Sequence, residues 1–201
     1  MKMKLGFMGI GLIAGLALVL AAWSYVTANQ PVSGVLIDPP ARAADFTLTT
    51  GSGSQFNLGQ QRGKVTLMFF GYTNCPDVCP VTLSDYRRIR QALGDLADQV
   101  NLVFITIDPE RDSLERVAAY TANFDPAIVG LSGTEAELEP VWKAYGVYRE
   151  KVETASAAGY LMDHSSRVYV IDRQGQLRLT FPFGLELEKM VGDIRRLLRN
   201  K

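Results

Sequence analysis

The apolar run Val-Thr-Leu-Met-Phe-Phe at 65–70 constrains the fold of this chain more than any other feature. A continuous run of this length is typical of a central strand that is covered on both faces. After a short turn, apolar residues recur every three or four positions, as on one face of a helix, at Leu83, Tyr86, Ile89, Leu93 and Leu96. A β-branched run follows at 101–107. The order predicts a β-α-β unit with parallel strands, and therefore an α/β domain.

Further segments predict the rest of a central mixed sheet flanked by helices. Alternating apolar residues around a Gly-Ser-Gly-Ser turn indicate an N-terminal β-hairpin. Two positions with an acidic residue three places further on resemble capping boxes that open helices. The predicted elements are the hairpin over 46–58, helices opening at Asp112 and Thr134, a hairpin over 167–181 and a closing helix over 185–198.

Residues 1–23 predict a single N-terminal transmembrane helix. The 19 residues from 5 to 23 carry no charge, and as a helix they rise about 28 Å, close to the hydrocarbon thickness of a bilayer. Because Lys2 and Lys4 precede this run, we expect a cytoplasmic N-terminus, a single pass through the inner (cytoplasmic) membrane, and a domain on the periplasmic or extracytoplasmic side. Cleavage as a signal peptide near Val26-Thr27-Ala28 is the alternative. Both routes lead to a compartment that permits disulfides.

The remaining chain is interpreted as a linker over 24–44, which contains Pro31, Pro39 and Pro40 and shows no periodic pattern, and one domain over 45–201. Without Lys2 and Lys4, the chain has 19 Lys and Arg against 21 Asp and Glu. It therefore lacks the basic surplus expected of a nucleic-acid-binding protein, and no nucleic-acid partner is predicted.

The motif Cys75-Pro76-Asp77-Val78-Cys79-Pro80 lies where the first predicted strand passes into the helix. If both cysteines lie in the first helical turn, they project from one face, because residues four apart are about 40° apart around the axis. The free amides and dipole of a helix N-terminus lower thiol pKa values. Such a pair of exposed thiolates can form a reversible disulfide or bind a soft metal ion. The alternative is a purely structural disulfide, but a disulfide that closes so short a loop adds little to the stability of the folded chain.

The single histidine, His164, is the candidate third ligand. It precedes the strand predicted to begin at Arg167. If that strand pairs antiparallel with 65–70, its start lies beside the other's end, and the imidazole lies near the cysteine turn. A lone histidine is often a structural residue, but this placement favours a ligand. Two thiolates and an imidazole suit Cu(I), whereas a structural zinc site needs a fourth protein ligand.

The chain resembles the Sco/SenC family of membrane-anchored copper chaperones for cytochrome c oxidase, which have a thioredoxin-like fold. The resemblance covers about residue 45 to the C-terminus. It rests on five stretches, namely Asp45-Phe46-Thr47-Leu48, Gly63-Lys64-Val65, Phe70-Gly71-Tyr72-Thr73 leading into the cysteine motif, Asp108-Pro109-Glu110-Arg111-Asp112, and Asp163-His164-Ser165-Ser166.

The resemblance implies that Cys75, Cys79 and His164 are copper ligands. It implies copper as the bound metal, as Cu(I) with Cu(II) as a further option. It also implies delivery to the dinuclear copper A centre of cytochrome c oxidase subunit II, or to another copper-receiving protein, from a membrane-anchored domain.

Three carboxylates are further candidates at this site. Asp77 can tune the thiolates or complement the helix N-terminus, Asp108 follows a strand and can face the site, and Asp163 can orient the imidazole or remain solvated. Met68 is assigned to the core, and Met162 is a less favoured soft ligand.

Two functions remain open at this stage. A metallochaperone needs all three ligands, and the three residues between the cysteines differ from the two of the usual thiol oxidoreductase motif. A thiol:disulfide reductase that keeps a partner's copper-binding cysteines reduced needs Cys75 and Cys79 as a redox-active pair, but not His164. The metallochaperone is favoured over the enzyme. Peroxide reduction is a third, weaker interpretation.

Overall fold

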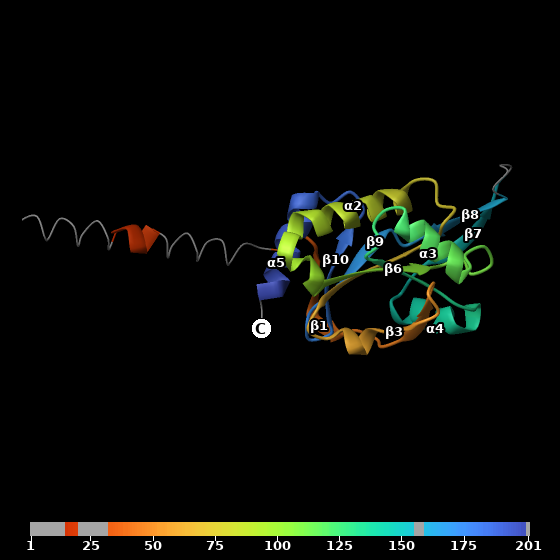
Figure 1. The fold of residues 1–201 in the computed structure, drawn as a ribbon, viewed down its shortest axis with the longest axis horizontal. Helices are drawn as coiled ribbons and strands as arrows, with labels where there is room; N and C mark the ends of the chain where they lie inside the picture. Colours follow the sequence, from red (N-terminus) through yellow and green to blue (C-terminus); the bar gives the residue numbers. More distant parts are fainter. Residues whose placement is uncertain (1–14, 20–31, 155–158, 200–201) are drawn as a thin grey trace, which may run out of the picture. The chain divides into compact units, whose positions relative to one another are not determined.

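The computed structural model describes residues 15–19, 32–154 and 159–199 (Figure 1). The chain divides into two compact units, Met1–Val32 and Ser33–Lys201. In the first unit, residues 15–19 are helical, and the rest of the transmembrane helix predicted over 1–23 lies outside the described residues. Within the described part of the chain, no helix has the length and apolar character needed to cross a membrane.

Across the described part of the second unit, an eight-stranded mixed sheet runs in the order β1-β10-β9-β4-β5-β6-β2-β3. The central strand β4 is parallel to β5 and antiparallel to β9. A separate two-stranded sheet joins β7 and β8. The strands are β1 (Val35–Arg42), β2 (Thr47–Thr50), β3 (Gln55–Asn57), β4 (Val65–Gly71), β5 (Val100–Thr106), β6 (Ile128–Ser132), β7 (Arg149–Glu153), β8 (Tyr160–His164), β9 (Arg167–Ile171) and β10 (Gln176–Pro182).

Helices cover both faces of the large sheet, as predicted. Helices α2 and α5 pack against each other on one face, and α4 lies on the other (Figure 1). The helices are α2 (Val78–Leu93), α3 (Leu114–Ala122), α4 (Glu135–Ala144) and α5 (Leu187–Arg199), with short 3-10 turns η1 (Leu58–Gln61) and η2 (Gly94–Gln99).

The predicted β-α-β unit is confirmed. Every residue of β4 is buried, and its parallel register with β5 places Val65 opposite Val100 and Gly71 opposite Thr106. Successive side chains of a strand point to opposite faces, so Phe69 packs near Phe104 while Phe70 contacts the rings of Tyr145 and Tyr169. Both hairpins and the closing helix are confirmed as well.

The segment interpreted as a linker contains a strand. β1 pairs antiparallel with β10 at the edge of the sheet, and the register shifts between Leu36 and Ala41 around the two prolines. An edge strand needs hydrogen bonds on one side only, so it tolerates proline, and most β1 side chains are exposed. Such a strand carries no apolar alternation, which is why the sequence pattern did not reveal it.

Two helix boundaries differ from their predictions. Ser113, not Asp112, caps α3, because its side chain accepts a hydrogen bond from the backbone N–H of Arg116. Helix α2 ends at Leu93, so Leu96 lies in η2 rather than on the helix. The capping box of Thr134 and Glu137 at the start of α4 is confirmed.

Candidate metal centre

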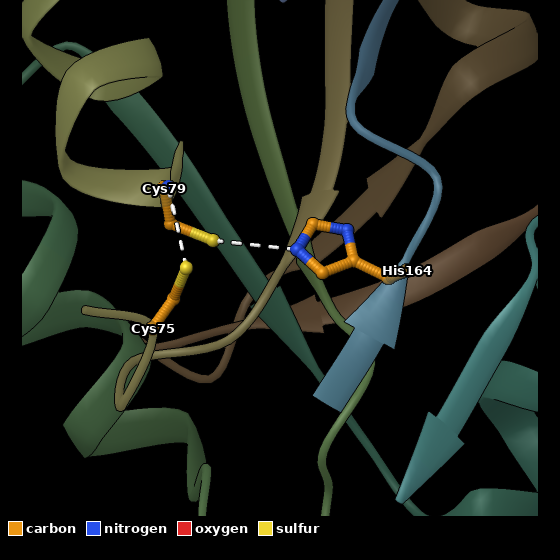
Figure 2. Close-up of side chains that lie close together, drawn as sticks. All are labelled: Cys75, Cys79 and His164. Carbon is orange, nitrogen blue, oxygen red and sulfur yellow. Dashed lines mark hydrogen bonds between the residues drawn. The ribbon is translucent and has the colours of Figure 1, made fainter. Parts of the chain in front are cut away.

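Cys75, Cys79 and His164 converge beyond the carboxyl end of β4 (Figure 2). The two Sγ atoms and an imidazole nitrogen all lie within 4.8 Å of one another. Cys79 Sγ is 3.8 Å from His164 Nε2. Among the residues that the structure describes, this is the one group of three or more His, Cys, Asp or Glu side chains able to hold a metal ion.

Strand pairing brings the histidine to the cysteines across 85 residues of sequence. β9 is antiparallel to β4, with Val168 opposite Phe69, so the residues just before β9 lie beyond the end of β4. The predicted antiparallel pairing is therefore confirmed. His164 itself is the last residue of β8, a strand that the sequence pattern did not indicate.

The cysteines do not share a helical turn, contrary to the prediction. Helix α2 begins at Val78, so Cys79 lies in its first turn and Cys75 lies in the loop before it. The two sulfurs are still neighbours, because the loop folds back and the Cys79 backbone N–H donates a hydrogen bond to Cys75 Sγ at 3.4 Å. The Asp77 side chain makes no capping hydrogen bond. Instead, the sulfur of Cys75 accepts a hydrogen bond from one of the free backbone amides of the helix N-terminus.

The two thiols have opposite acidities. The Cys79 thiol donates a hydrogen bond to Cys75, and with contributions from His164 and two backbone amides it lowers the pKa of Cys75 from its usual 9.0 to about 4. Burial raises the pKa of Cys79 well above its usual range, and the adjacent Cys75 raises it further. In the metal-free chain at neutral pH, the site therefore holds one thiolate and one thiol, rather than the two activated thiolates predicted from the sequence.

This difference predicts the pH dependence of alkylation. In the reduced, metal-free chain, iodoacetamide should modify Cys75 at a nearly constant rate from pH 8 down to about pH 5, because only the thiolate reacts. The rate should fall as the pH drops through about 4, where Cys75 gains its proton. Mass spectrometry of the labelled peptide measures the profile. The same chain in denaturant is the control, and there the rate should already fall below pH 8. A folded-chain midpoint near pH 9 would contradict the prediction.

The family model described as SCO1/SenC matches residues 36–199. The chain belongs to this family. It is 30% identical over 186 residues to a SCO2-like protein of Rickettsia prowazekii, and the match covers 90% of this chain and 91% of the relative.

Solved structures of Sco proteins share the fold. The copper-bound ScoI of Bradyrhizobium japonicum is 40% identical, with a TM-score of 0.72, and the match covers 79% of this chain and all of that one. The copper-bound Sco1 of yeast is 30% identical, with a TM-score of 0.71, and the match covers 81% and 91% of the two chains. The mixed α/β architecture described above is thus the thioredoxin-like Sco fold.

In this SCO1/SenC chain, aromatic rings and one carbonyl hold the imidazole. The ring of His164 packs edge-on against Tyr72 and Phe69, with centroids 5.9 and 6.0 Å apart. Its Nδ1 lies 3.2 Å from the backbone oxygen of Ser165. When a metal ion is bound, a proton on Nδ1 would satisfy that oxygen and leave the Nε2 lone pair free to bind the ion, as in many metal sites.

The candidate carboxylates lie in three different places. Asp77 is exposed at the start of α2. Asp163 is exposed and lies opposite Glu150 in the small sheet, whereas the imidazole Nδ1 faces the Ser165 carbonyl. Asp108 is buried and bonds to Arg111 and Tyr160 rather than to a ligand.

The two methionines considered as soft ligands lie in different places. Met68 is fully buried within β4, as assigned. Met162 is 4% exposed and lines the open hollow of about 400 Å³ beside the site, together with Tyr72, Cys75, Tyr148, Leu161 and His164. An incoming group can therefore approach Cys75 and His164 from this side.

The sequence analysis missed a buried polar support beneath the cysteine loop. The Asp112 carboxylate accepts hydrogen bonds from the Thr73 backbone N–H at 3.0 Å, the Thr73 hydroxyl at 2.5 Å and the Thr106 hydroxyl at 2.7 Å. Asp112 is thus bound to the segment that carries Cys75, rather than capping α3. The predicted β-α-β unit could have indicated this contact. The parallel strands β4 and β5 end at the same edge of the sheet, which brings the loop after β4 and the loop after β5 together.

Proposed function

We propose that this chain is a membrane-anchored, extracytoplasmic copper metallochaperone that holds Cu(I) through Cys75, Cys79 and His164. The observation that carries the proposal is the convergence of two sulfurs and one imidazole nitrogen beside an open hollow. Thiolates select Cu(I), and imidazole is also a good copper ligand. Copper bound to the Bradyrhizobium and yeast relatives supports the same cargo here.

The donor spacing fits a single soft ion. Three donors that hold one ion in a plane, with bonds of roughly 2.0–2.3 Å, lie about 3.5–4 Å apart. Here the donors lie within 4.8 Å of one another, a difference that side-chain rotation can close. Loading requires loss of the Cys79 proton, because the metal ligand is the thiolate. Cu(II), which imidazole also suits, is the further cargo that we include.

Transfer would proceed by ligand exchange from the exposed side. Cys75 is half-buried and lines the hollow, whereas Cys79 is fully buried. A ligand of the partner therefore reaches the ion beside Cys75 first, and Cys79 is released last. On the family resemblance, we propose the copper A centre of cytochrome c oxidase subunit II, or another copper-receiving protein, as the acceptor. Residues 1–23 would anchor the chain, with the domain on the extracytoplasmic side of the inner membrane.

Replacing His164 by alanine tests the ligand set. We expect His164→Ala to weaken Cu(I) binding by roughly thirtyfold, about 2 kcal/mol, because two sulfurs remain and the third donor is lost. Competition with a chromophoric Cu(I) chelator measures the affinity. Asp163→Ala is the matched control, since this exposed neighbour lies on the same strand, and its affinity should stay within about twofold of the parent value. Unchanged affinity in His164→Ala would remove the histidine from the site.

A thiol:disulfide reductase is the second candidate, and the opposite acidities of the two thiols favour it. The Cys75 thiolate would attack a partner disulfide, forming a mixed disulfide and releasing one partner thiolate. Cys79 would then lose its proton and attack Cys75 Sγ. This releases the second partner thiolate and leaves a Cys75–Cys79 disulfide, and a dithiol reductant would restore the pair.

The two candidates differ in their need for the histidine. The reductase needs both sulfurs but not His164. Normal oxidase assembly in a His164→Ala strain, together with a reducing potential of the cysteine pair, would favour the reductase. Failed assembly would favour the metallochaperone.

A further inference from the structure

The hairpin that carries His164 lies outside the large sheet. In the described residues, β7 and β8 pair with each other and with no strand of the eight-stranded sheet. A lone two-stranded hairpin is marginally stable in water. The pairing of β9 with β4 places the residues just before β9 near the cysteines, whereas side-chain contacts hold the rest of the hairpin, and so the orientation of β8, against the domain.

Arg111 makes one set of such contacts, at the start of β8. Its Nε donates a hydrogen bond to Asp108 Oδ2 at 2.5 Å, and its Nη1 donates one to the backbone oxygen of Tyr160 at 2.9 Å. The guanidinium also stacks on the Tyr160 ring, with its central carbon 3.5 Å from the centroid. Arg111 thus joins the loop after β5 to the first residue of β8.

The same guanidinium lies over a ring that packs against the imidazole. Its central carbon lies 5.8 Å from the ring centroid of Tyr72, which packs edge-on against His164. The Asp108 carboxylate, which binds the guanidinium, is buried. Its other oxygen accepts a hydrogen bond from the Tyr160 hydroxyl at 2.7 Å. Each of Arg111, Asp108 and Tyr160 thus bonds to the other two, and together they connect the domain to the hairpin.

The other attachments of the hairpin differ in kind. Lys151 pairs with Glu110, but both side chains are largely exposed, and exposed ion pairs contribute little. Arg149 on β7 stacks on Trp142 and donates a hydrogen bond to the Ile107 carbonyl. With Arg149 in place, loss of Arg111 should shift the β8 side of the hairpin rather than detach it.

We propose that Arg111 is a positioning residue that holds the His164-bearing hairpin against the cysteine turn, so that the third copper ligand is in place before the ion arrives. This inference rests on the proposed function of the site. The proposal gives Arg111, within the motif Asp108–Asp112, a role that the three proposed ligands do not explain. Arg111 acts on copper only through His164, which makes the proposal testable by a double-mutant cycle.

The test compares Arg111→Met with and without His164→Ala in the full chain. Alone, Arg111→Met should weaken Cu(I) binding by roughly tenfold, as expected when a group that orients a metal ligand is lost. In the His164→Ala background, the same substitution should change the affinity by less than about twofold, because the residue through which it acts is gone. Chelator competition measures all four affinities.

A spectroscopic readout separates positioning from general destabilisation. Because His164 is the only histidine, its two imidazole ¹⁵N signals report ligation without ambiguity. In the Cu(I)-loaded parent, Nε2 should move to a metal-bound shift, and in Arg111→Met it should return toward the free value. Arg88→Met is the control, since that ion pair with Asp85 lies within α2, and it should leave affinity and shift unchanged.

Each outcome decides the proposal. Parent-like affinity and ¹⁵N shift in Arg111→Met would overturn it, and so would an equal loss of affinity in the His164→Ala background. If Arg111→Met does not fold, Arg111→Lys enters the same cycle, because it keeps a cation beside Asp108 but lacks the planar fork. A His164→Ala chain that binds Cu(I) normally would instead refute the ligand set of the proposed function.

Discussion

Replacing Cys79 by serine should weaken Cu(I) binding by about three orders of magnitude, or about 4 kcal/mol. A hydroxyl is a poor ligand for a soft ion, and Cys79 is the fully buried donor next to the imidazole nitrogen. Among the three converging side chains, the remaining sulfur belongs to Cys75, which already serves as a ligand in the proposed site. Chelator competition on the reduced chain gives the affinity.

Met162→Leu is the matched control for the loss of sulfur. Met162 lines the same hollow and is 4% exposed, and leucine has a similar volume. Its affinity for Cu(I) should remain within about twofold of the parent value, since neither the cysteines nor the histidine changes. A Cys79→Ser chain that binds Cu(I) within tenfold of the parent would contradict the three-ligand site. A large loss in Met162→Leu would instead add the thioether to the ligands.

Gly71→Ala should lower the free energy of unfolding by about 3 kcal/mol, near the upper end of the usual cost of overpacking a core. Gly71 ends β4 directly beneath the cysteine turn. An added Cβ would lie 2.7 Å from Cys79 Sγ and 2.9 Å from both the Phe69 and Phe104 rings. Real Cβ contacts are longer, so the sulfur and both rings would have to move. Denaturant unfolding of the metal-free chain measures the loss.

The same substitution at Gly192 should raise the free energy of unfolding rather than lower it. Gly192 lies within α5, and nothing lies within 4 Å of an added Cβ. Alanine should therefore stabilise the chain, by up to about 1 kcal/mol, through its higher helix propensity. If Gly71→Ala and Gly192→Ala had equal effects, close packing between β4 and Cys79 would not be what requires the glycine.

Elements with a strong local pattern could be predicted from the sequence. The apolar run of β4, the amphipathic face of α2 and the capping box of α4 are set by residues within a few positions of one another. β1, β7 and β8 lack such a pattern, because β1 is a mostly exposed edge strand and β7 and β8 form a small sheet with several exposed or half-exposed side chains. Periodicity cannot reveal a strand that buries no regular face.

The sequence predicted the convergence of Cys75, Cys79 and His164 better than the local geometry around them. The three candidate ligands followed from residue type and from the expected pairing of β9 with β4. The start of α2 at Val78, which leaves Cys75 in the loop, did not follow from spacing. As a result, the sequence predicted two similar thiolates, whereas burial of one sulfur and its hydrogen bond to the other produce a thiolate and a thiol.

By itself, the sequence determined the chemistry that is available: two sulfurs, a single imidazole and a β-α-β unit to present them. Only the tertiary structure decided which groups support that chemistry. Asp112 became a buried acceptor for the cysteine loop instead of a helix cap, and Arg111 came to rest on a hairpin whose first strand lies 38 positions further along the chain. The reason is physical, because the burial of a charge and its hydrogen-bond partners depend on segments that meet only when the sheet forms, and no local pattern encodes that meeting.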